Sequence, residues 1–134
     1  MRPFHIDDSM KTMRGVFYPT GWMVLMFDGE QHAREAVRTL EQNGFGGDAM
    51  MLMSPQDVKR ELAGTEGDDA ILPSAGTEGD TVRKIVECAS KGHHGLMVHA
   101  PHSEDSDRVV ELLKGAPISY GQKYRKLVIE DIVA

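Results

Sequence analysis

The sequence predicts an α+β domain built on a four-stranded antiparallel sheet. A strand-then-helix pattern occurs twice, at 22–40 and again at 95–113. Two further apolar runs, at 49–53 and 117–120, are bounded by glycine, proline or serine, as strands commonly are. We expect the helices of the two copies to pack on one face of the sheet. A doubly wound parallel sheet is the alternative, because strands and helices also alternate through the middle of the chain.

The first copy begins with an apolar strand at 22–27. Successive side chains of a strand point to opposite faces, so both faces of this strand are apolar. Asp28 and Gln31 follow at the spacing of a helix capping box. An apolar stripe at helical spacing then predicts a helix. Its members are Ala33, Ala36, Val37 and Leu40.

The middle of the chain, 55–92, is predicted to be a helical segment. The stretch 54–57, with the sequence SPQD, combines a cap residue, a proline at the first helical position and an acid in the first turn. A second amphipathic helix begins at Asp80 or Thr81. Between the two helices, 64–80 is acidic, rich in glycine and contains GTEGD twice, so we expect a mobile loop there.

The second copy of the pattern starts with a strand at 96–99. Ser103 offers a side-chain oxygen to free backbone amides, so we expect it to cap a helix that ends at Gly115. The last strand follows at 117–120, with Gly121 as a candidate bulge. The apolar residues near the C-terminus form either an added edge strand or a docked tail.

We divide the chain into an N-terminal arm, 1–21, and a single α+β domain, 22–134. Because the strands at 22–27 and 49–53 are apolar on both faces, a sheet with one solvated face does not fit them. Either the helices of 55–92 or a second copy of the chain must cover the second face. We predict a homodimer, since two-fold dimers are the commonest symmetric assembly.

The composition indicates a cytoplasmic protein that folds without a metal or a disulfide. The 134 residues suit one domain, and the single cysteine cannot form an internal bridge. The sequence shows neither a long apolar run nor a basic-then-apolar N-terminus, so we expect neither membrane insertion nor export. The net charge of −6 opposes binding to nucleic-acid phosphates. No dinucleotide-binding or P-loop motif is present, so no cofactor is predicted.

In four segments the chain resembles the family of small bacterial heat-induced or general-stress proteins. These segments are 24–28 with the helix 33–44, and 95–115 with 116–131. The resemblance implies a ferredoxin-like βαββαβ sandwich, with 55–92 inserted between the second and third strands. Family members often carry a long apolar stretch rich in glycine and alanine at that point, whereas this chain has two polar amphipathic helices. This departure argues against a membrane-associated role. The resemblance implies a non-enzymatic, stress-associated binding or assembly module of unknown ligand, and it supplies no catalytic residues.

Histidines are concentrated around the third strand, and neutral imidazole is the commonest metal ligand in proteins. No two of them form a helical histidine-glutamate signature. Two interpretations therefore stay open, a metal-binding protein or a set of solvated and hydrogen-bonded side chains. The candidate ligands are His93, His94, His99 and His102.

Cys88 lies beside the apolar stripe of its predicted helix, and His93 follows five residues later. A histidine that approached the thiol would activate it as a nucleophile. A cysteine in this position is more often a small buried hydrophobe. The alternative function is therefore a small enzyme with a cleft on the open side of the sheet, which uses His99 or Cys88. A small-molecule ligand is compatible with the enzyme and with the binding module.

A basic cluster at 123–126 lies beside Tyr120 and Tyr124. Basic and aromatic side chains together can contact a nucleic-acid strand. We favour a charged sheet edge that resists aggregation, because the chain as a whole is acidic.

Overall fold

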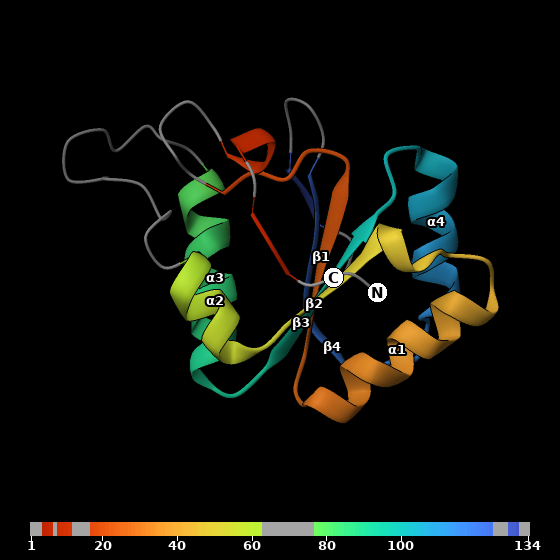
Figure 1. The fold of residues 1–134 in the computed structure, drawn as a ribbon, viewed down its shortest axis with the longest axis horizontal. Helices are drawn as coiled ribbons and strands as arrows, with labels where there is room; N and C mark the ends of the chain where they lie inside the picture. The colour runs from red at the N-terminus through yellow and green to blue at the C-terminus, as the bar shows by residue number, and fades with distance from the viewer. Residues whose placement is uncertain (1–3, 7, 12–16, 63–76, 125–128, 132–134) are drawn as a thin grey trace.

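A computed structural model describes residues 4–6, 8–11, 17–62, 77–124 and 129–131 (Figure 1). These residues form one antiparallel sheet between two layers of helices, so the predicted α+β class is confirmed. The predicted mobile loop at 64–80 lies outside the described residues except for the first turn of the helix that follows it. None of the helices in the described ranges combines the length and the apolar character that a membrane crossing requires.

Within the described residues the sheet has five strands, in the order β2-β3-β1-β4-β5. All of its strand pairs are antiparallel, so the doubly wound parallel alternative is wrong. The fifth strand resolves the choice left open near the C-terminus in favour of an edge strand, and it makes the sheet one strand wider than predicted. The strands are β1 (Trp22–Phe27), β2 (Met50–Met53), β3 (His94–His99), β4 (Ile118–Tyr124) and β5 (Ile129–Asp131).

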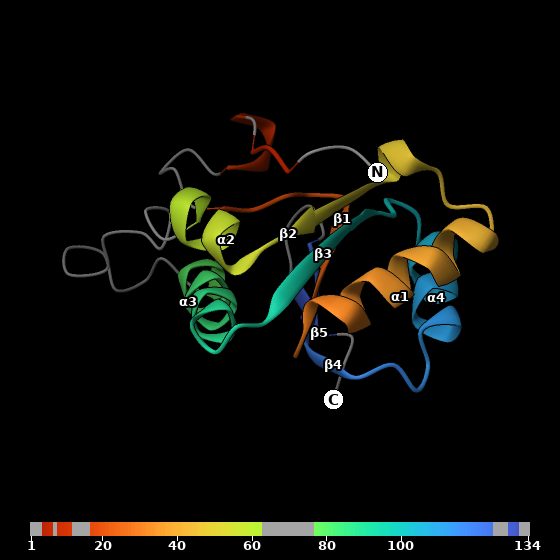
Figure 2. The ribbon, with the colours of Figure 1, turned by 60° about the horizontal axis from the view of Figure 1, so that its bottom comes forward.

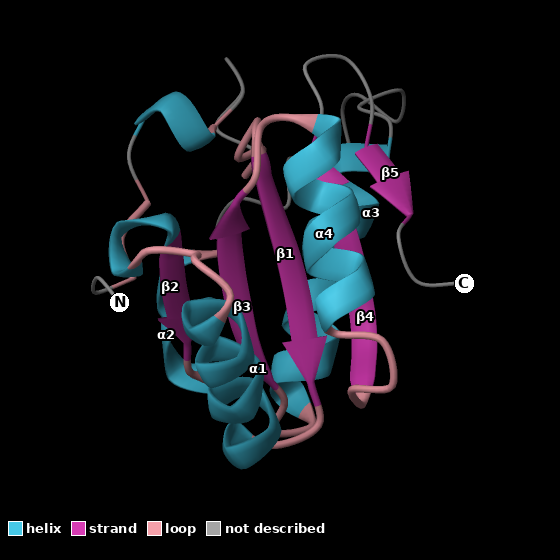
Figure 3. Ribbon diagram, turned by 90° about the vertical axis from the view of Figure 1, so that its right-hand side faces the viewer, coloured by secondary structure: helices cyan, strands magenta, loops and turns pink. Residues whose placement is uncertain are grey.

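The two strand-helix units interleave in the sheet. Since β1 and β2 are both antiparallel to β3, they run in the same direction with β3 between them. Likewise β3 and β4 run in the same direction with β1 between them. The helices α1 (Glu30–Gln42) and α4 (Ser103–Leu112) make the two crossings. Figure 3 shows both helices lying on the same face of the sheet, as predicted.

The face under α1 and α4 holds one of two apolar cores. Alternate residues of β1, namely Met23, Leu25 and Phe27, point into it and are almost completely buried. The predicted stripe of α1 is buried against them, because its members recur on one side of the helix. Val109 and Leu113 pack into the same core from the side of α4. This half of the molecule follows the sequence pattern directly.

The opposite face of the sheet is covered by this chain itself. Figure 2 shows α2 (Pro55–Glu61) and α3 (Thr77–Ser90) lying together on that side. They bury the other residues of β1, and Phe17 of the predicted arm joins the same core. The open sheet side that supported an enzymatic cleft and a homodimer is therefore not found, because the inserted helices occupy it. The molecule has three layers, and the homodimer itself stays a prediction.

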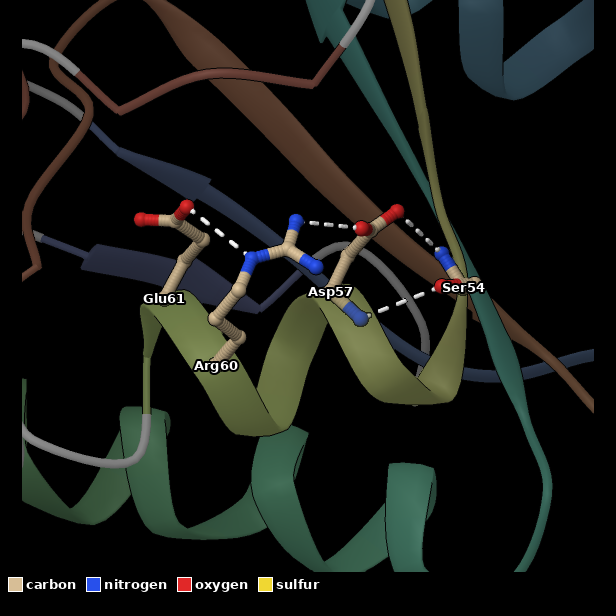
Figure 4. A network of polar contacts seen from close by, with 4 residues as sticks. All are labelled: Ser54, Asp57, Arg60 and Glu61. Atoms are coloured by element: carbon tan, nitrogen blue, oxygen red, sulfur yellow. Dashed lines mark hydrogen bonds and ion pairs between the residues drawn. The ribbon is translucent and has the colours of Figure 1, made fainter.

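The start of α2 confirms the predicted cap (Figure 4). Asp57 N donates to the Ser54 hydroxyl at 3.1 Å, and Ser54 N donates to an Asp57 carboxylate oxygen at 3.0 Å. Arg60 donates to the other carboxylate oxygen at 2.7 Å, and it also contacts Glu61. Burial acts to raise the pKa of Asp57, but the hydrogen bonds from Ser54 and Arg60 outweigh it and lower that pKa.

Two other predicted caps are wrong. Gly29, not Asp28, is the cap residue of α1, and no side chain bonds to the free amides. The Asp28 carboxylate instead contacts His32 Nδ1 at 2.6 Å, one helical turn further on. His102 is the cap residue of α4, and Ser103 is already the first residue of that helix. In addition, α3 begins three residues before the predicted start at Asp80.

Tyr124, at the end of β4, is completely buried in the core on the α2–α3 face. Its ring makes edge contacts with Phe17 and Tyr18. Within the described part of the chain its hydroxyl has no hydrogen-bond partner. Burial raises the pKa of Tyr124 well above its usual value near 10, because the phenolate would be charged inside an apolar core.

We expect Tyr124→Phe to raise the free energy of unfolding by about 1 kcal/mol at neutral pH, because an unsatisfied buried hydroxyl is removed. The raised pKa also gives a pH dependence. The native state holds this proton more tightly than the unfolded state, so stability is complete below about pH 10 and falls as the pH rises further. Urea denaturation of both proteins at neutral and alkaline pH measures the two effects. The substituted protein should lose less stability at alkaline pH, and an identical loss would contradict the assignment.

Candidate functional site

A pocket of about 200 Å³ lies between α4 and the sheet. Its floor comes from β1 and from the first residue of β4, and its wall comes from Val109 and Val110 of α4. Residues of the α4–β4 connection form the mouth. Below we call this cavity the α4 pocket. It is lined by Met23, Leu25, Val109, Val110, Leu113, Lys114, Gly115, Ala116 and Ile118.

The sequence of β4 explains why a space remains under α4. Gly121 stands opposite Leu25 in the β1–β4 pair, and glycine contributes no side chain to the floor of the sheet there. The register also shifts between Met26 and Phe27, so that Tyr120 and Ile118 oppose them and Ser119 is left without a partner residue. The predicted bulge at Gly121 is therefore wrong, since the extra residue is Ser119.

The mouth of the α4 pocket is partly exposed. Val110 is the only large apolar residue in the described ranges that is classed as exposed, and 42% of its surface is accessible. Lys114 is also exposed and lies at the same end. A soluble protein tolerates single exposed apolar residues, but here the residue continues an apolar pocket. The α4 pocket is thus accessible to a small molecule from solvent.

Lys123 and Ser106 lie nearer the N-terminal end of α4, and neither of them lines the pocket. Lys123 is the cross-strand partner of Met23 on the pocket floor, and Ser106 is one helical turn before Val109. Lys123 Nζ is 2.5 Å from Ser106 Oγ, and the two residues are 2% and 4% exposed. Ser106 Oγ already donates its hydrogen to the Ser103 carbonyl at 3.0 Å. Lys123 must therefore be the donor in the bond between them.

This burial corrects the predicted charged sheet edge at 123–126. Lys123 and Tyr124 belong to β4, which is an inner strand because β5 pairs with its outer side. Both residues are buried. The other members of the predicted cluster, Arg125 and Lys126, lie outside the described residues.

The structure does not bring the candidate metal ligands together. His94 and His99 occupy the two ends of β3, which places them about 16 Å apart at roughly 3.3 Å per residue. His93 lies at the first end and His102 beyond the second. One ion cannot contact all four. Among the described residues, no group of three or more potential ligands could hold a metal ion.

Each histidine has its own surroundings. His93 Nδ1 is 2.8 Å from Ser119 Oγ. His94 Nε2 lies 4.0 Å from a Glu30 oxygen, while its buried Nδ1 has no partner in the described chain. The His99 ring lies against Trp22, with 5.0 Å between the ring centroids. These contacts are those of separate side chains rather than of one site.

Cys88 is near His93, as the sequence suggested, because His93 N donates to the Cys88 carbonyl at 3.1 Å. Ser119 Oγ is 2.8 Å from His93 Nδ1, and the same residue acts on the pKa of the Cys88 thiol. Burial is the largest influence on the Cys88 thiol and raises its pKa, although Ser119 and Lys91 act in the opposite direction. A thiol with a raised pKa is protonated at neutral pH and is a poor nucleophile. His99 is at the far end of β3, so it does not assist Cys88.

Sequence reasoning missed the pairing of Lys123 with Ser106. The alternation of side chains along a strand was the available signal, because it places Lys123 on the same face as Gly121. To predict this pairing, one must also know the position of β4 inside the sheet, and local sequence patterns do not give that position. Comparisons of the chain with known protein families, with curated proteins and with solved structures find no match.

Proposed function

We propose that this protein is a non-enzymatic binding module that holds a small molecule in the α4 pocket. The observation that carries the proposal is the apolar lining of that pocket, in which Lys114 at the mouth is the one charged side chain. Ligand sites are typically apolar concave surfaces with a few polar groups that fix orientation. By contrast, the Cys88 thiol is protonated and His99 is remote from it, which disfavours the enzymatic alternative.

The size of the α4 pocket limits the ligand. Its volume of about 200 Å³ is below the range of roughly 300–1,000 Å³ that is usual for drug-sized ligands. An apolar cavity of about 150 Å³ in another protein accepts benzene. The proposed ligand is accordingly a single ring or a short aliphatic chain.

The proposal retains the cytoplasmic, stress-associated role that the sequence predicts. The interleaved β-α-β units support a relationship to the ferredoxin-like arrangement. The whole sheet departs from that four-stranded arrangement by β5, and α2 and α3 add a third layer. Dimerisation, if it occurs, would use a surface other than the covered sheet face.

Titration of the protein with 1-hexanol, followed by NMR of backbone amides and methyl groups, tests the proposal. We expect saturable shifts at Val109, Val110 and Leu113, with a Kd of about 1 mM or lower, which corresponds to about −4 kcal/mol. Methyl groups on the opposite face of the sheet, such as that of Val82, should not respond. Shifts confined to that opposite face, or no saturable shift, would refute the proposal.

We expect Val110→Trp to weaken hexanol binding at least about tenfold, because the ring would fill the mouth of the α4 pocket and a lost apolar contact of this size is worth about 1.4 kcal/mol or more. Glu111→Trp is the matched control. Glu111 is exposed on the same helix and does not line the pocket. Equal weakening by both substitutions would indicate a general effect on α4 rather than occupancy of the pocket.

A further inference from the structure

We infer that a second copy of this chain docks on the outer side of α4, with the two α4 helices antiparallel, and covers the mouth of the α4 pocket. The contact surface is a row of exposed residues, Asp107, Val110 and Lys114, which we call the α4 stripe. The inference goes beyond the proposed function, because it assigns an interface to the predicted homodimer and needs no ligand. Figure 3 shows the outer side of α4 facing the viewer, with no described element in front of it.

The centre of the α4 stripe is apolar. Val110 is 42% exposed and borders the α4 pocket of about 200 Å³. A single exposed valine needs no partner of its own. Here, however, a projecting apolar side chain and an apolar hollow lie next to each other on one surface. In a two-fold dimer the same surface meets itself, so Val110 of each copy contacts the pocket mouth of the other.

The charges on either side of Val110 have opposite signs. Asp107 precedes Val110 by three residues and Lys114 follows it by four, in the turn after the helix, and such spacings bring side chains together on a helix surface. When two α4 helices lie antiparallel with Val110 near the centre, Asp107 of each copy faces Lys114 of the other. A parallel arrangement would place like charges opposite each other. In the described part of the chain, the ion pairs use neither side chain.

This self-complementarity favours a second copy over an unrelated partner, because one surface supplies the acid, the base, the apolar projection and the hollow. The interface is small. The 10 residues of α4 extend over about 15 Å, at roughly 1.5 Å per residue. Contacts that bury less than about 1,200 Å² are typical of weak, transient complexes. We therefore expect a dimer with a Kd of about 0.1 mM.

Sedimentation equilibrium between about 10 μM and 1 mM protein tests the inference, since this range spans the expected Kd. The mass should rise from 14.8 kDa towards twice that value as the concentration increases. Val110→Asp should weaken the dimer at least about tenfold, because it places two carboxylates at the centre of the contact. Val110 is exposed, so this variant keeps its fold, which circular dichroism verifies.

Exchange of the two charges tests the antiparallel orientation. Asp107→Lys and Lys114→Asp should each weaken the dimer about fivefold or more, because each places like charges together at two symmetry-related positions. The double variant should restore the wild-type Kd within about twofold. Glu87→Lys is the matched control for the change in net charge, since Glu87 is exposed on α3 across the sheet, and it should not weaken the dimer.

The cover over the pocket mouth predicts competition with a ligand. If 1-hexanol binds the monomer, about 10 mM of it should weaken the dimer at least about tenfold. A protein that stays monomeric at 1 mM would overturn the inference, as would a dimer that is insensitive to Val110→Asp or is not restored by the double variant. A dimer that ignores 1-hexanol, although the monomer binds it, would also overturn it. A dimer that depends on the α4 stripe while the monomer binds no 1-hexanol would support the inference and refute only the proposed function.

Discussion

Ile85→Asp is expected to lower the free energy of unfolding by about 4 kcal/mol or more, a large part of the total stability of an ordinary domain. Ile85 is completely buried on α3, within the core that α2 and α3 form with the sheet. The substitution removes a branched apolar side chain and places a carboxylate there. Denaturant unfolding, followed by circular dichroism, measures the loss.

Lys84→Asp is the control for this prediction. Lys84 precedes Ile85 on α3, is exposed and lies over the Tyr120 ring at 5.9 Å. We expect a loss of about 1 kcal/mol or less, since only a partly solvated cation–π contact is removed. Similar effects of the two substitutions would mean that α3 does not close the sheet. The second face would then be free for another copy of the chain, as the sequence alone suggested.

The strands and the main helices were predictable because their signals are local. Apolar residues at 22–27 and the stripe on α1 are each contained within a few turns of chain, and the structure follows both. The two apolar faces of β1 also showed correctly that the sheet must be covered twice. They could not show which elements cover the second face of the sheet. That depended on how 55–62 and the helix after the loop pack together, which is a long-range contact.

The caps show how a local signal can fail. Ser54 and Asp57 satisfy each other reciprocally, and Arg60 adds a further hydrogen bond to the Asp57 carboxylate. Asp28 has similar spacing but contacts His32, so Gly29 takes the cap position. Spacing alone therefore predicts a capping box only where the acid or hydroxyl has no better partner.

The candidate site was the least predictable part. The histidines are close in sequence, but a strand extends the chain by about 3.3 Å per residue, so β3 separates them. The predicted strand by itself already implied that these histidines are separated. Lys123 and Ser106, in contrast, are 17 residues apart and meet only because β4 pairs beside β1 under α4. Their pairing could be derived only from the topology of the sheet.

Phe27→Ala is expected to lower the free energy of unfolding by about 3–5 kcal/mol, the usual range for removing a buried phenylalanine side chain. Phe27 ends β1 and is completely buried in the core beneath α1 and α4. The pairing of β1 with β4 shifts register at this residue, where Ile118 opposes it. Because the sheet is irregular here, we expect the neighbouring side chains to collapse only partly into the space left behind.

Phe27→Leu separates the loss of volume from the loss of contact area. Leucine retains most of the apolar volume, so we expect a cost below about 1.5–2 kcal/mol, measured by the same urea titration. The α4 pocket shares this core, since Leu25 and Ile118 belong to both. If the pocket is a site maintained by a rigid core, Phe27→Ala should weaken 1-hexanol binding as well as stability, whereas Phe27→Leu should retain binding. A Phe27→Ala protein that loses stability yet binds 1-hexanol unchanged would show that the pocket does not depend on this end of the sheet.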